Sequence, residues 1–493
     1  MRIGFDNDKY IALQAEHIRE RIGQFGGKLY LEFGGKLFDD HHASRVLPGF
    51  QPDSKIRMLK QFADDVEIIV AINANDIEKN KMRGDLGITY DEDVLRLLDI
   101  FANMGFATAG VVITRYENQP SAAAFRQKLS SLGVKSYLHY PIAGYPYDIA
   151  RINSDDGFGK NEFVETTRPL VVVTAPGPGS GKMATALSQL YHEHKRGVTA
   201  GYAKFETFPI WNLPLKHPVN LAYEAATADL NDVNMIDPFH LETYGVTTVN
   251  YNRDVEIFPV VSAIFEQIAG ESPYHSPTDM GVNMAGNCII DDDACREASC
   301  QEIIRRYYQA LCDVRMGLGD ESSVRKLELL MNQANVSTAN RPVAAAALRR
   351  ADETGAPAAA IELPDGTIVT GKTTALLGSS AAALLTALKT LAGLPHDLHV
   401  LPQLIIEPIQ KLKIEGLGNH NPRLHTDEVL IALSISAATN PVAELALAQL
   451  PRLSGCEVHS SVMLAQVDTG VFKKLGMNLT CEPHYQTKKL YHK

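Results

Sequence analysis

Apolar runs the length of a strand alternate with helix-forming segments along the first two-thirds of the chain. The runs are rich in Val, Ile, Leu, Ala and aromatic residues and cover 28–33, 66–73, 107–114, 134–140, 170–175 and 198–205. Because these runs do not alternate with polar residues, they are typical of strands buried on both faces. Strands of this kind, separated by helices, predict an α/β fold built on a mostly parallel, doubly wound sheet.

The clearest helical spacing between these runs is that of Val94, Leu97, Leu98 and Phe101, which fall on one helix face. Asp91 is the expected N-cap of this helix, and Gly105 is the residue expected to end it. In sheets of this type, ligands bind beyond the carboxyl ends of the strands. Ligand-binding side chains are therefore expected in the segments that directly follow the strands.

The pattern changes after a long helix predicted from about Asp291. The stretch "GLGDESS" (317–323) follows this helix, and the chain beyond it is rich in alanine. There, "AAAIELPDGTIVTGK" predicts a β-hairpin over 358–372 with Asp365-Gly366 at its turn, and an apolar helix is predicted over 379–393. We therefore expect two domains, an α/β nucleotide-binding-like domain over 1–322 and a smaller C-terminal α/β domain over 323–493.

The amino-acid composition and net charge limit which kinds of partner the protein is expected to bind. The 493 residues are 45% hydrophobic and 21% charged, which is an ordinary globular balance. The net charge of −11 and the scattered Lys and Arg residues argue against nucleic acid as the main partner. No apolar run approaches the roughly 18 residues of a membrane span, and the N-terminus has no apolar core of the signal-peptide type. We therefore expect a cytoplasmic protein.

The cysteines predict no metal site. The six of them form no Cys-x-x-Cys pair, so the spacing of a structural zinc site is missing and reduced thiols are expected. We therefore predict no metal ligands.

A glycine-rich loop between a strand and a helix is the main candidate for chemistry. It lies in "LVVVTAPGPGSGKMATALSQLYHE" (170–193), where Gly177, Gly179, Ser180 and Gly181 precede Lys182. Glycines let backbone N–H groups approach an anion closely, and a lysine can contact the outer phosphates of a nucleotide. This pattern predicts a phosphate-binding loop with Lys182 as a catalytic candidate.

Two positions depart from the usual G-x-x-x-x-G-K-[ST] pattern. Pro176 replaces the first glycine, and Met183 replaces the hydroxyl that would hold Mg²⁺. The stretch resembles the T-P-x-x-x-G-E-G-K loop of formyltetrahydrofolate synthetases, which also lacks the first glycine. The alternative is a glycine-rich turn with an exposed lysine and no ligand.

A second glycine loop follows the first strand, in "LEFGGKLFDDHHASRVLPGF". Gly34, Gly35 and Lys36 come directly after the strand, and Asp39, Asp40, His41, His42 and Arg45 follow within seven positions. We expect Gly34 and Gly35 to contact the same ligand as the loop at Lys182, with His41 and Arg45 as catalytic candidates. The alternative is a solvated loop whose charges pair locally.

Two further stretches hold polar residues suited to binding. "SPYHSPTDMGVNMAGN" (272–287) carries Asp279, a catalytic candidate that could hold Mg²⁺ in place of the missing hydroxyl, although a hydrogen-bonded turn is the equally good alternative. "INANDIEKNKMRGD" (72–85) follows the second strand at the expected ligand edge and offers Asn73, Asn75, Asp76, Lys81 and Arg83, but it also fits an ordinary charged loop.

The C-terminal hairpin and helix weakly resemble the opening of cytidine-deaminase-like domains. Those enzymes need His-x-Glu or Cys-x-Glu and a later Cys-x-x-Cys to hold zinc, and this sequence has neither. The resemblance implies a deaminase-like domain without its metal.

As a whole, the chain resembles a bacterial protein family described only as a domain of unknown function. The resemblance rests on "FGGKLFDDHHASRVLPGF", "NKMRGDLGITYDEDVLRL", "GPGSGK", "SPTDMGVNMAG" and "KKLGMNLTCEP" and covers nearly the full length. It implies a cytosolic protein with a nucleotide-binding-like core, and large α/β proteins of this kind are often homo-oligomers.

Two functions fit these residues. The first is an ATP-using transferase or ligase that acts on a small anionic metabolite, with ATP and Mg²⁺ as candidate cofactors. The second is a nucleotide-binding or scaffolding protein without turnover, in which Met183 reflects lost metal chemistry. A dinucleotide is disfavoured because G-x-G-x-x-G is missing from the sequence.

Overall fold

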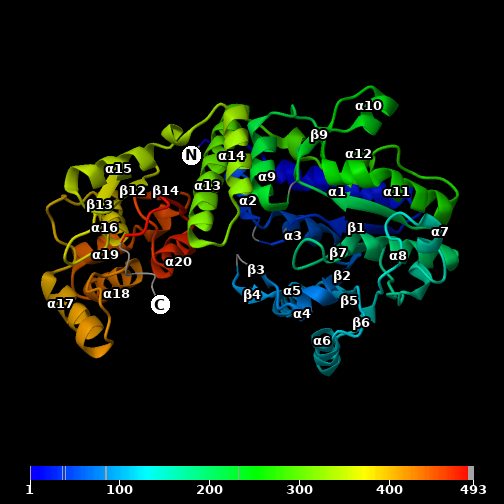
Figure 1. Cartoon of the computed structure of the whole chain (residues 1–493), viewed down its shortest axis with the longest axis horizontal. Coiled ribbons are helices and arrows are strands. Elements are labelled where there is room, and N and C mark those ends of the chain that lie inside the picture. Colours follow the sequence, from blue (N-terminus) through cyan, green and yellow to red (C-terminus); the bar gives the residue numbers. More distant parts are fainter. Residues whose placement is uncertain (1, 36, 39, 84–85, 231, 487–493) are drawn as a thin grey trace. The chain divides into compact units, whose positions relative to one another are not determined.

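The computed structural model of the chain describes residues 2–35, 37–38, 40–83, 86–230 and 232–486 (Figure 1). Its contacts divide the chain into a larger unit, Arg2–Ser299, and a smaller unit that contains Cys300–Lys493. The division falls inside helix α13 (Asp292–Met316), whereas the sequence composition changes after this helix ends. A helix can begin in one core and end in another, so contacts and composition need not mark the same boundary.

The larger unit is built on a seven-stranded sheet with the order β11-β8-β1-β7-β2-β5-β6. Every neighbouring pair in this sheet is parallel. Its strands are β1 (Leu29–Phe33), β2 (Val66–Asn73), β5 (Ala107–Thr114), β6 (Ser136–Leu138), β7 (Leu170–Thr174), β8 (Gly201–Phe205) and β11 (Gly281–Val282). The predicted α/β class and the mostly parallel sheet are therefore confirmed. The six apolar runs supply six of the seven strands, and the short edge strand β11 was not predicted.

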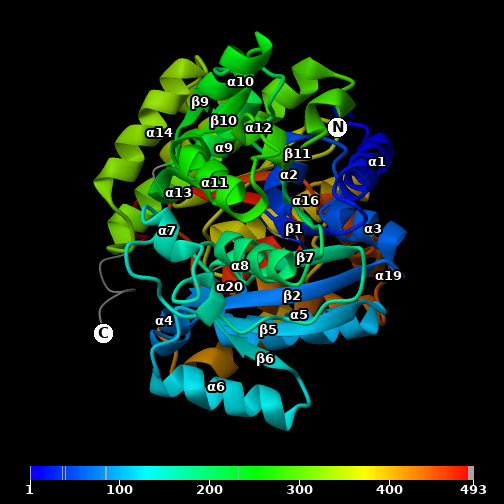
Figure 2. The same cartoon turned by 90° about the vertical axis from the view of Figure 1, so that its right-hand side faces the viewer.

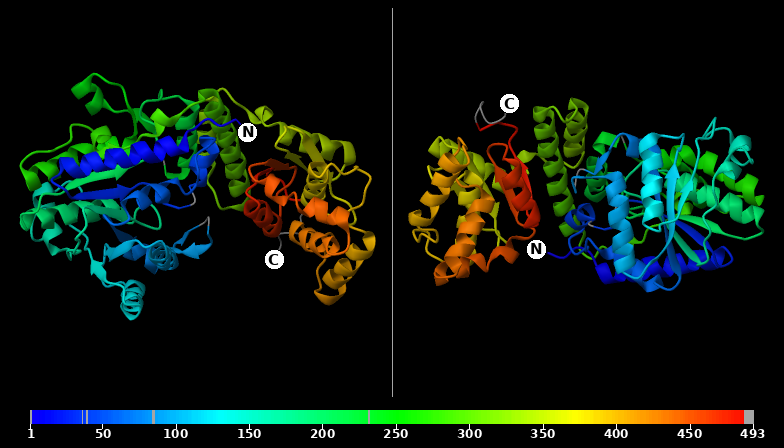
Figure 3. Two further views of the ribbon diagram at one scale, coloured as in Figure 1. Left: turned by 180° about the vertical axis from the view of Figure 1, so that it is seen from behind. Right: turned by 90° about the horizontal axis from the view of Figure 1, so that it is seen from below.

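Helices cover both faces of this sheet. All residues of β1, β2, β7 and β8 are buried, which requires covering on both sides. On one face Tyr30 donates a hydrogen bond to Glu193 of α8 (Lys182–Lys195) across 2.7 Å. On the other face Phe33 stacks on Phe205 with ring centroids 4.3 Å apart. Figure 2 shows α8 in front of the strands, and α1 (Asn7–Gln24) runs alongside the sheet in Figure 3.

The remaining elements of the larger unit connect or flank these strands. Its other helices are α2 (His41–Val46), α3 (Ser54–Leu59), η1 (Lys60–Phe62), α4 (Ala74–Glu78), α5 (Tyr90–Asn103), α6 (Pro120–Ser131), α7 (Ile149–Ile152), η2 (Phe158–Lys160), α9 (Pro218–Ala226), η3 (Ala228–Leu230), α10 (Pro238–Tyr244), α11 (Asn252–Ala269), α12 (Pro277–Met280) and η4 (Ala285–Cys288). Two short antiparallel pairs join β3 (Met82–Arg83) to β4 (Ile88–Thr89) and β9 (Asn234–Ile236) to β10 (Val249–Tyr251).

Helix α5 begins earlier than its apolar spacing predicts. Thr89, not Asp91, is the N-cap, and Asp91 lies in the first turn. The reason is a capping box, in which the Glu92 side chain accepts a hydrogen bond from the Thr89 N–H across 2.9 Å. The helix ends where Gly105 predicted, since this glycine comes just after the last turn and adopts a left-handed φ of 78°.

The smaller unit contains a four-stranded mixed sheet with the order β13-β12-β14-β15. The predicted hairpin is β12 (Ala358–Glu362) with β13 (Ile368–Lys372), and the predicted apolar helix is α16 (Ser379–Leu391). The other elements are α14 (Glu321–Gln333), η5 (Thr338–Asn340), α15 (Pro342–Thr354), α17 (Gln403–Lys411), η6 (Leu412–Gly416), α18 (Thr426–Ala437), α19 (Pro441–Leu447), η7 (Leu450–Leu453), β14 (Glu457–Ser460), α20 (Gln466–Lys474) and β15 (Asn478–Cys481).

Over the residues that the structure describes, no helix of either unit is both long enough and apolar enough to cross a bilayer.

Candidate functional site

The glycine loop of residues 176–181 leaves the centre of the large sheet. It follows β7, which lies between β1 and β2, and it leads directly into α8. Because all strands of this sheet are parallel, the segments that follow β1, β2, β5, β6 and β8 leave at the same edge. This is the edge at which sheets of this type bind their ligands.

Side chains from neighbouring strands fix the carbonyl groups of the loop. The Asn73 amide donates a hydrogen bond to the Gly179 carbonyl across 3.2 Å, and the Thr114 hydroxyl donates to the Ser180 carbonyl across 2.8 Å. The buried Ser180 hydroxyl donates to the Gly177 carbonyl across 2.9 Å. Asn73 ends β2 and Thr114 ends β5, so two strands hold the loop in one conformation.

The N–H groups of the same loop are left without partners. In the described part of the chain, no hydrogen bond is formed by the backbone N–H groups of Gly177, Gly179, Ser180 and Gly181 or of residues 182–184. The first helical N–H with a partner is that of Thr185, which donates to the Gly181 carbonyl across 2.9 Å. Unpaired N–H groups and the positive end of the helix dipole both favour an anion at this position.

Two of the glycines are required for different reasons. Gly181 is the N-cap of α8 with a left-handed φ of 86°, and a Cβ atom there would lie 3.0 Å from the Thr114 side chain. Gly177 has no left-handed φ, but a Cβ atom there would collide with the ring of Tyr90. The close packing of the loop thus explains glycine at both positions.

A cavity of about 550 Å³ lies beside the loop and the first turn of α8. Its polar lining includes Glu32, Asn75, Thr114, Arg115 and Lys182, and its apolar lining includes Tyr140, Pro141, Ile142, Tyr145 and Phe158. Pockets of this size and mixed lining are typical sites for small organic ligands.

Lys182 is half-buried at this cavity and is strongly influenced by its surroundings. Burial lowers the pKa of its ammonium group, Lys204 and Arg253 lower the pKa further, and Glu32 opposes them. Among the described residues, no hydrogen bond or ion pair is formed by the Lys182 side chain. An anion in the cavity would provide the counter-charge that this lysine lacks.

A buried group of charges lies on the same face of the sheet. Lys204 of β8 forms ion pairs with Asp254 and, across 2.8 Å, with Glu206. Burial raises the pKa of Glu206 to about 7. Glu32 stands opposite Lys204 in the register of β1 and β8, and it accepts a hydrogen bond from the Tyr202 hydroxyl across 2.7 Å. Glu32 therefore joins this charged group to the cavity.

Sequence reasoning did not select Glu32, Thr114, Arg115 or His139, although all four line the cavity. Each lies at the end of a predicted strand or directly after it, so the rule for the carboxyl edge could have found them. His139 is buried, and this burial lowers the pKa of its ring to about 4, so the ring is neutral at pH 7.

The second glycine loop starts at the same edge but does not line this cavity. Gly34 donates its N–H to the Phe205 carbonyl across 3.0 Å, and the buried Lys55 side chain pairs with Asp40 across 2.8 Å. Gly34, Gly35, His41 and Arg45 are not among the described residues that line the cavity of Lys182. Within the loop, Asp40 thus has a local partner in Lys55 of α3, and Lys36 and Asp39 lie outside the described residues.

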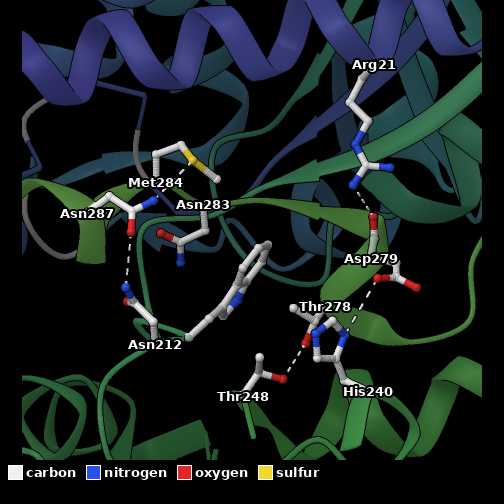
Figure 4. A pocket seen from close by; sticks show the side chains of 10 residues that line it. Arg21, Asn212, His240, Thr248, Thr278, Asp279, Asn283, Met284 and Asn287 are labelled. Atoms are coloured by element: carbon white, nitrogen blue, oxygen red, sulfur yellow. Dashed lines mark hydrogen bonds and ion pairs between the residues drawn. The ribbon is translucent and has the colours of Figure 1, made fainter. Parts of the chain in front are cut away.

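Asp279 lies away from Lys182, in a second cavity. This cavity has a volume of about 330 Å³, and its lining residues include Arg21, Trp211, His240 and Asp279 (Figure 4). It shares no lining residue with the cavity of Lys182. The hypothesis that Asp279 replaces the hydroxyl missing at Met183 is therefore not supported by its position, because the carboxylate belongs to a different site.

Over the described ranges, no group of three or more His, Cys, Asp or Glu side chains is arranged to hold a metal ion. The described cysteine side chains are all free thiols.

The fold and the loop define an α/β protein with a glycine-rich strand–loop–helix at the carboxyl edge of its sheet. Family models match nearly the whole chain, with "Domain of unknown function DUF1846, N-terminal" over residues 3–335 and "Domain of unknown function DUF1846, C-terminal" over residues 339–491. The chain belongs to this DUF1846 family.

Curated relatives include UPF0371 proteins of streptococci. The relative in Streptococcus pyogenes serotype M3 is 58% identical over 491 residues, which are 100% of this chain and 99% of the relative. The relative in Streptococcus uberis is 58% identical over 492 residues, with 100% of both chains covered. The resemblance stated from the sequence motifs is thereby confirmed.

Proposed function

We propose that the larger unit binds the phosphate groups of ATP at the loop of residues 176–182 and uses the nucleotide to transfer or ligate a small anionic metabolite. The observation that carries this proposal is the arrangement of the loop. Its carbonyls accept hydrogen bonds from Asn73, Thr114 and Ser180, while its N–H groups and those of the first turn of α8 have no partner among the described residues.

Electrostatics support phosphate over a neutral ligand. Lys182 lines the cavity next to the free N–H groups, and burial lowers the pKa of its ammonium group. A phosphate oxygen would stabilise the charged form of this lysine and at the same time accept hydrogen bonds from the loop. Donors fixed in advance lose little entropy on binding, and they also stabilise charge that develops during phosphoryl transfer.

The rest of the cavity can accommodate the other parts of such a ligand. Tyr140, Tyr145 and Phe158 provide aromatic surface for a base or another ring. Arg115 is a second cation at the cavity, and it forms no ion pair with any acidic residue that the structure describes. This guanidinium is suited to the carboxylate or phosphate of the metabolite.

A specific residue also favours a second function, nucleotide binding without turnover. Met183 follows Lys182 at the position where phosphate loops carry the hydroxyl that holds Mg²⁺, and its thioether is a poor ligand for this ion. In this second function, Mg²⁺ binds together with the phosphates without a side-chain ligand from the loop. The protein then binds the nucleotide and responds to it without hydrolysing it.

Thermal unfolding with a panel of ligands tests the proposal. ATP, ADP, AMP and inorganic pyrophosphate are each added with and without Mg²⁺, and adenosine serves as the control without phosphate. A ligand at about a hundred times its Kd stabilises the protein by about 2.7 kcal/mol. Stabilisation by ATP but not by adenosine supports the proposal, and release of ADP in the presence of metabolites distinguishes the enzyme from the non-catalytic protein. If no phosphate compound shifts the transition, the loop is only a turn.

A further inference from the structure

The second cavity is built from segments that are far apart in the sequence. Arg21 reaches it from α1, Trp211 and Asn212 come from the segment after β8, and His240 comes from α10 (Figure 4). Asp279 and Asn283 come from the stretch that the sequence singled out as a binding loop. Figure 4 shows the labelled asparagines on one side and His240, Thr278 and Asp279 on the other.

Two donors at this cavity are suited to a further acceptor. The Arg21 guanidinium donates to the carbonyls of Asp279 and Gly281, across 2.5 Å and 3.5 Å, and to the Gln24 side chain across 3.3 Å, but within the described residues it has no carboxylate within ion-pair distance. The indole N–H of Trp211 is buried and has no hydrogen-bond partner in the described part of the chain. A buried donor without a partner loses its hydration without compensation, so a ligand that offers an acceptor is favoured here.

The acidic side chain at the cavity is already engaged. The Asp279 carboxylate accepts hydrogen bonds from the Tyr244 hydroxyl across 2.9 Å and from the His275 N–H across 3.0 Å. Its other oxygen lies 3.6 Å from Nδ1 of His240. These contacts hold the Asp279 carboxylate on Tyr244, His275 and His240, while the Arg21 guanidinium contacts the Asp279 backbone carbonyl rather than its carboxylate.

Volume limits the size of the ligand. About 330 Å³ is near the lower end of the usual range for ligand pockets, which is too small for a nucleotide and suits a molecule the size of an amino acid. The amides of Asn212 and Asn287, which are joined by a hydrogen bond of 3.2 Å, can pair with donors or acceptors of such a molecule.

We propose that this cavity binds a small carboxylate of about the size of an amino acid or a dicarboxylic acid, with Arg21 and the Trp211 indole N–H as donors to its carboxylate. The proposal is independent of nucleotide binding, because the two cavities have no lining residue in common. A planar carboxylate matches the fork of a guanidinium, and its second oxygen can accept from an indole N–H.

The intrinsic tryptophan fluorescence of the protein can report carboxylate binding at this cavity. Trp211 is its one tryptophan, so selectively excited fluorescence comes from this cavity alone. The full-length protein is titrated with succinate and with glutamate, with inorganic phosphate as a different anion and succinamide as the uncharged analogue. Each titration is repeated by calorimetry. We expect a saturable response to at least one carboxylate and none to succinamide.

Two variants assign the response to the proposed donors. Arg21→Gln removes the charge and should weaken binding of the responding carboxylate about tenfold or more, as expected for a hydrogen bond to a charged group. The control is Arg19→Gln on the same helix, since Arg19 is exposed and stacks on Phe62 away from the cavity. Trp211→Phe keeps an aromatic ring without the N–H and should weaken binding in calorimetry.

Several outcomes would overturn the assignment. The assignment is wrong if neither succinate nor glutamate gives a response in fluorescence or calorimetry. It is also wrong if phosphate alone saturates the response. Equal affinity in wild type and in both Arg21→Gln and Trp211→Phe would show that any binding occurs elsewhere. Should Arg21→Gln prove unfolded by its melting curve, Trp211→Phe alone decides the matter.

Discussion

The hydroxyl of Thr114 donates a hydrogen bond to the carbonyl of Ser180 across 2.8 Å, although the two residues are 66 positions apart. Thr114 ends β5 and Ser180 lies in the glycine loop after β7, two strands away in the sheet. Together with the Asn73 amide, this hydroxyl engages the loop carbonyls, while the loop N–H groups have no partner among the described residues. The conformation of the loop is thus set by strands that the loop does not follow.

Removing the charge of Lys182 should weaken phosphate binding. We expect Lys182→Ala to reduce the binding free energy of ATP by about 1.5–3 kcal/mol, the range for a hydrogen bond to a charged group. Lys195→Ala is the matched control, because Lys195 ends the same helix, is exposed and pairs with Asp155. Calorimetry measures both, and unchanged ATP affinity in Lys182→Ala would rule out contact between this lysine and the ligand.

Binding of a phosphate ligand should cause Lys182 to take up protons at alkaline pH. Burial lowers the pKa of Lys182 in the free protein, and a bound anion would raise the pKa again. Affinity is then greatest below the pKa of the free protein and falls as the pH rises towards the pKa of the complex. Calorimetry in two buffers with different ionisation enthalpies measures the uptake. The uncharged variant Lys182→Met should show none, and equal uptake in both proteins would assign the protons to another group.

Alanine at Gly181 should cost more stability than alanine at Gly179. Both glycines have a left-handed φ, 86° and 77°, so each substitution should cost about 1–3 kcal/mol of unfolding free energy. Only at Gly181 would the new Cβ atom also press on Thr114, whereas at Gly179 no atom lies within 4 Å. Denaturant unfolding compares the two. Equal losses would mean that the Thr114 contact relaxes without cost.

A hydroxyl after Lys182 should increase the role of Mg²⁺. Met183→Thr restores the side chain that phosphate loops use to hold this ion. We expect the ratio of ATP affinities with and without Mg²⁺ to be larger in the variant than in wild type, and Met183→Leu provides the control without an oxygen. The same ratio in all three proteins would place the ion away from residue 183.

Stability of the smaller unit should depend on the pH through His425 and Asp468, whose side chains are 2.9 Å apart. The Asp468 hydrogen bond raises the pKa of His425 above 6.5, and although burial raises the pKa of Asp468, its bonds to His425 and Thr426 lower the pKa overall. The contribution of His425 is full below about pH 6.5 and disappears as the pH rises through the higher folded pKa. That of Asp468 disappears in acid.

The variant His425→Gln should therefore lose most stability, relative to wild type, between about pH 4 and pH 6.5, and the loss should shrink at higher pH. Calorimetric unfolding across this range measures it, with the exposed His420→Gln as the control. A loss that does not change with pH would show that His425 contributes through packing rather than charge.

The sequence by itself determined the elements and the glycine loop. Period and composition are local properties, so β2 and β5 were predicted with their observed bounds, and the loop from Pro176 to Lys182 was located between its strand and its helix. The N-cap of α5 was nevertheless predicted at the wrong residue, because Thr89 and Glu92 form a capping box ahead of the predicted cap Asp91.

Only the tertiary structure decided which residues share a site. Strand order is set by packing of whole faces, and it separates Asp279 from Lys182 while it brings Glu32, Thr114, Arg115 and Lys182 around one cavity. A stretch with many polar residues shows that polar groups are available, but not which cavity they line. The register of β1 and β8 places Glu32 and Lys204 on the face of the sheet from which Tyr30 contacts α8, because adjacent residues of a strand point to opposite faces of the sheet.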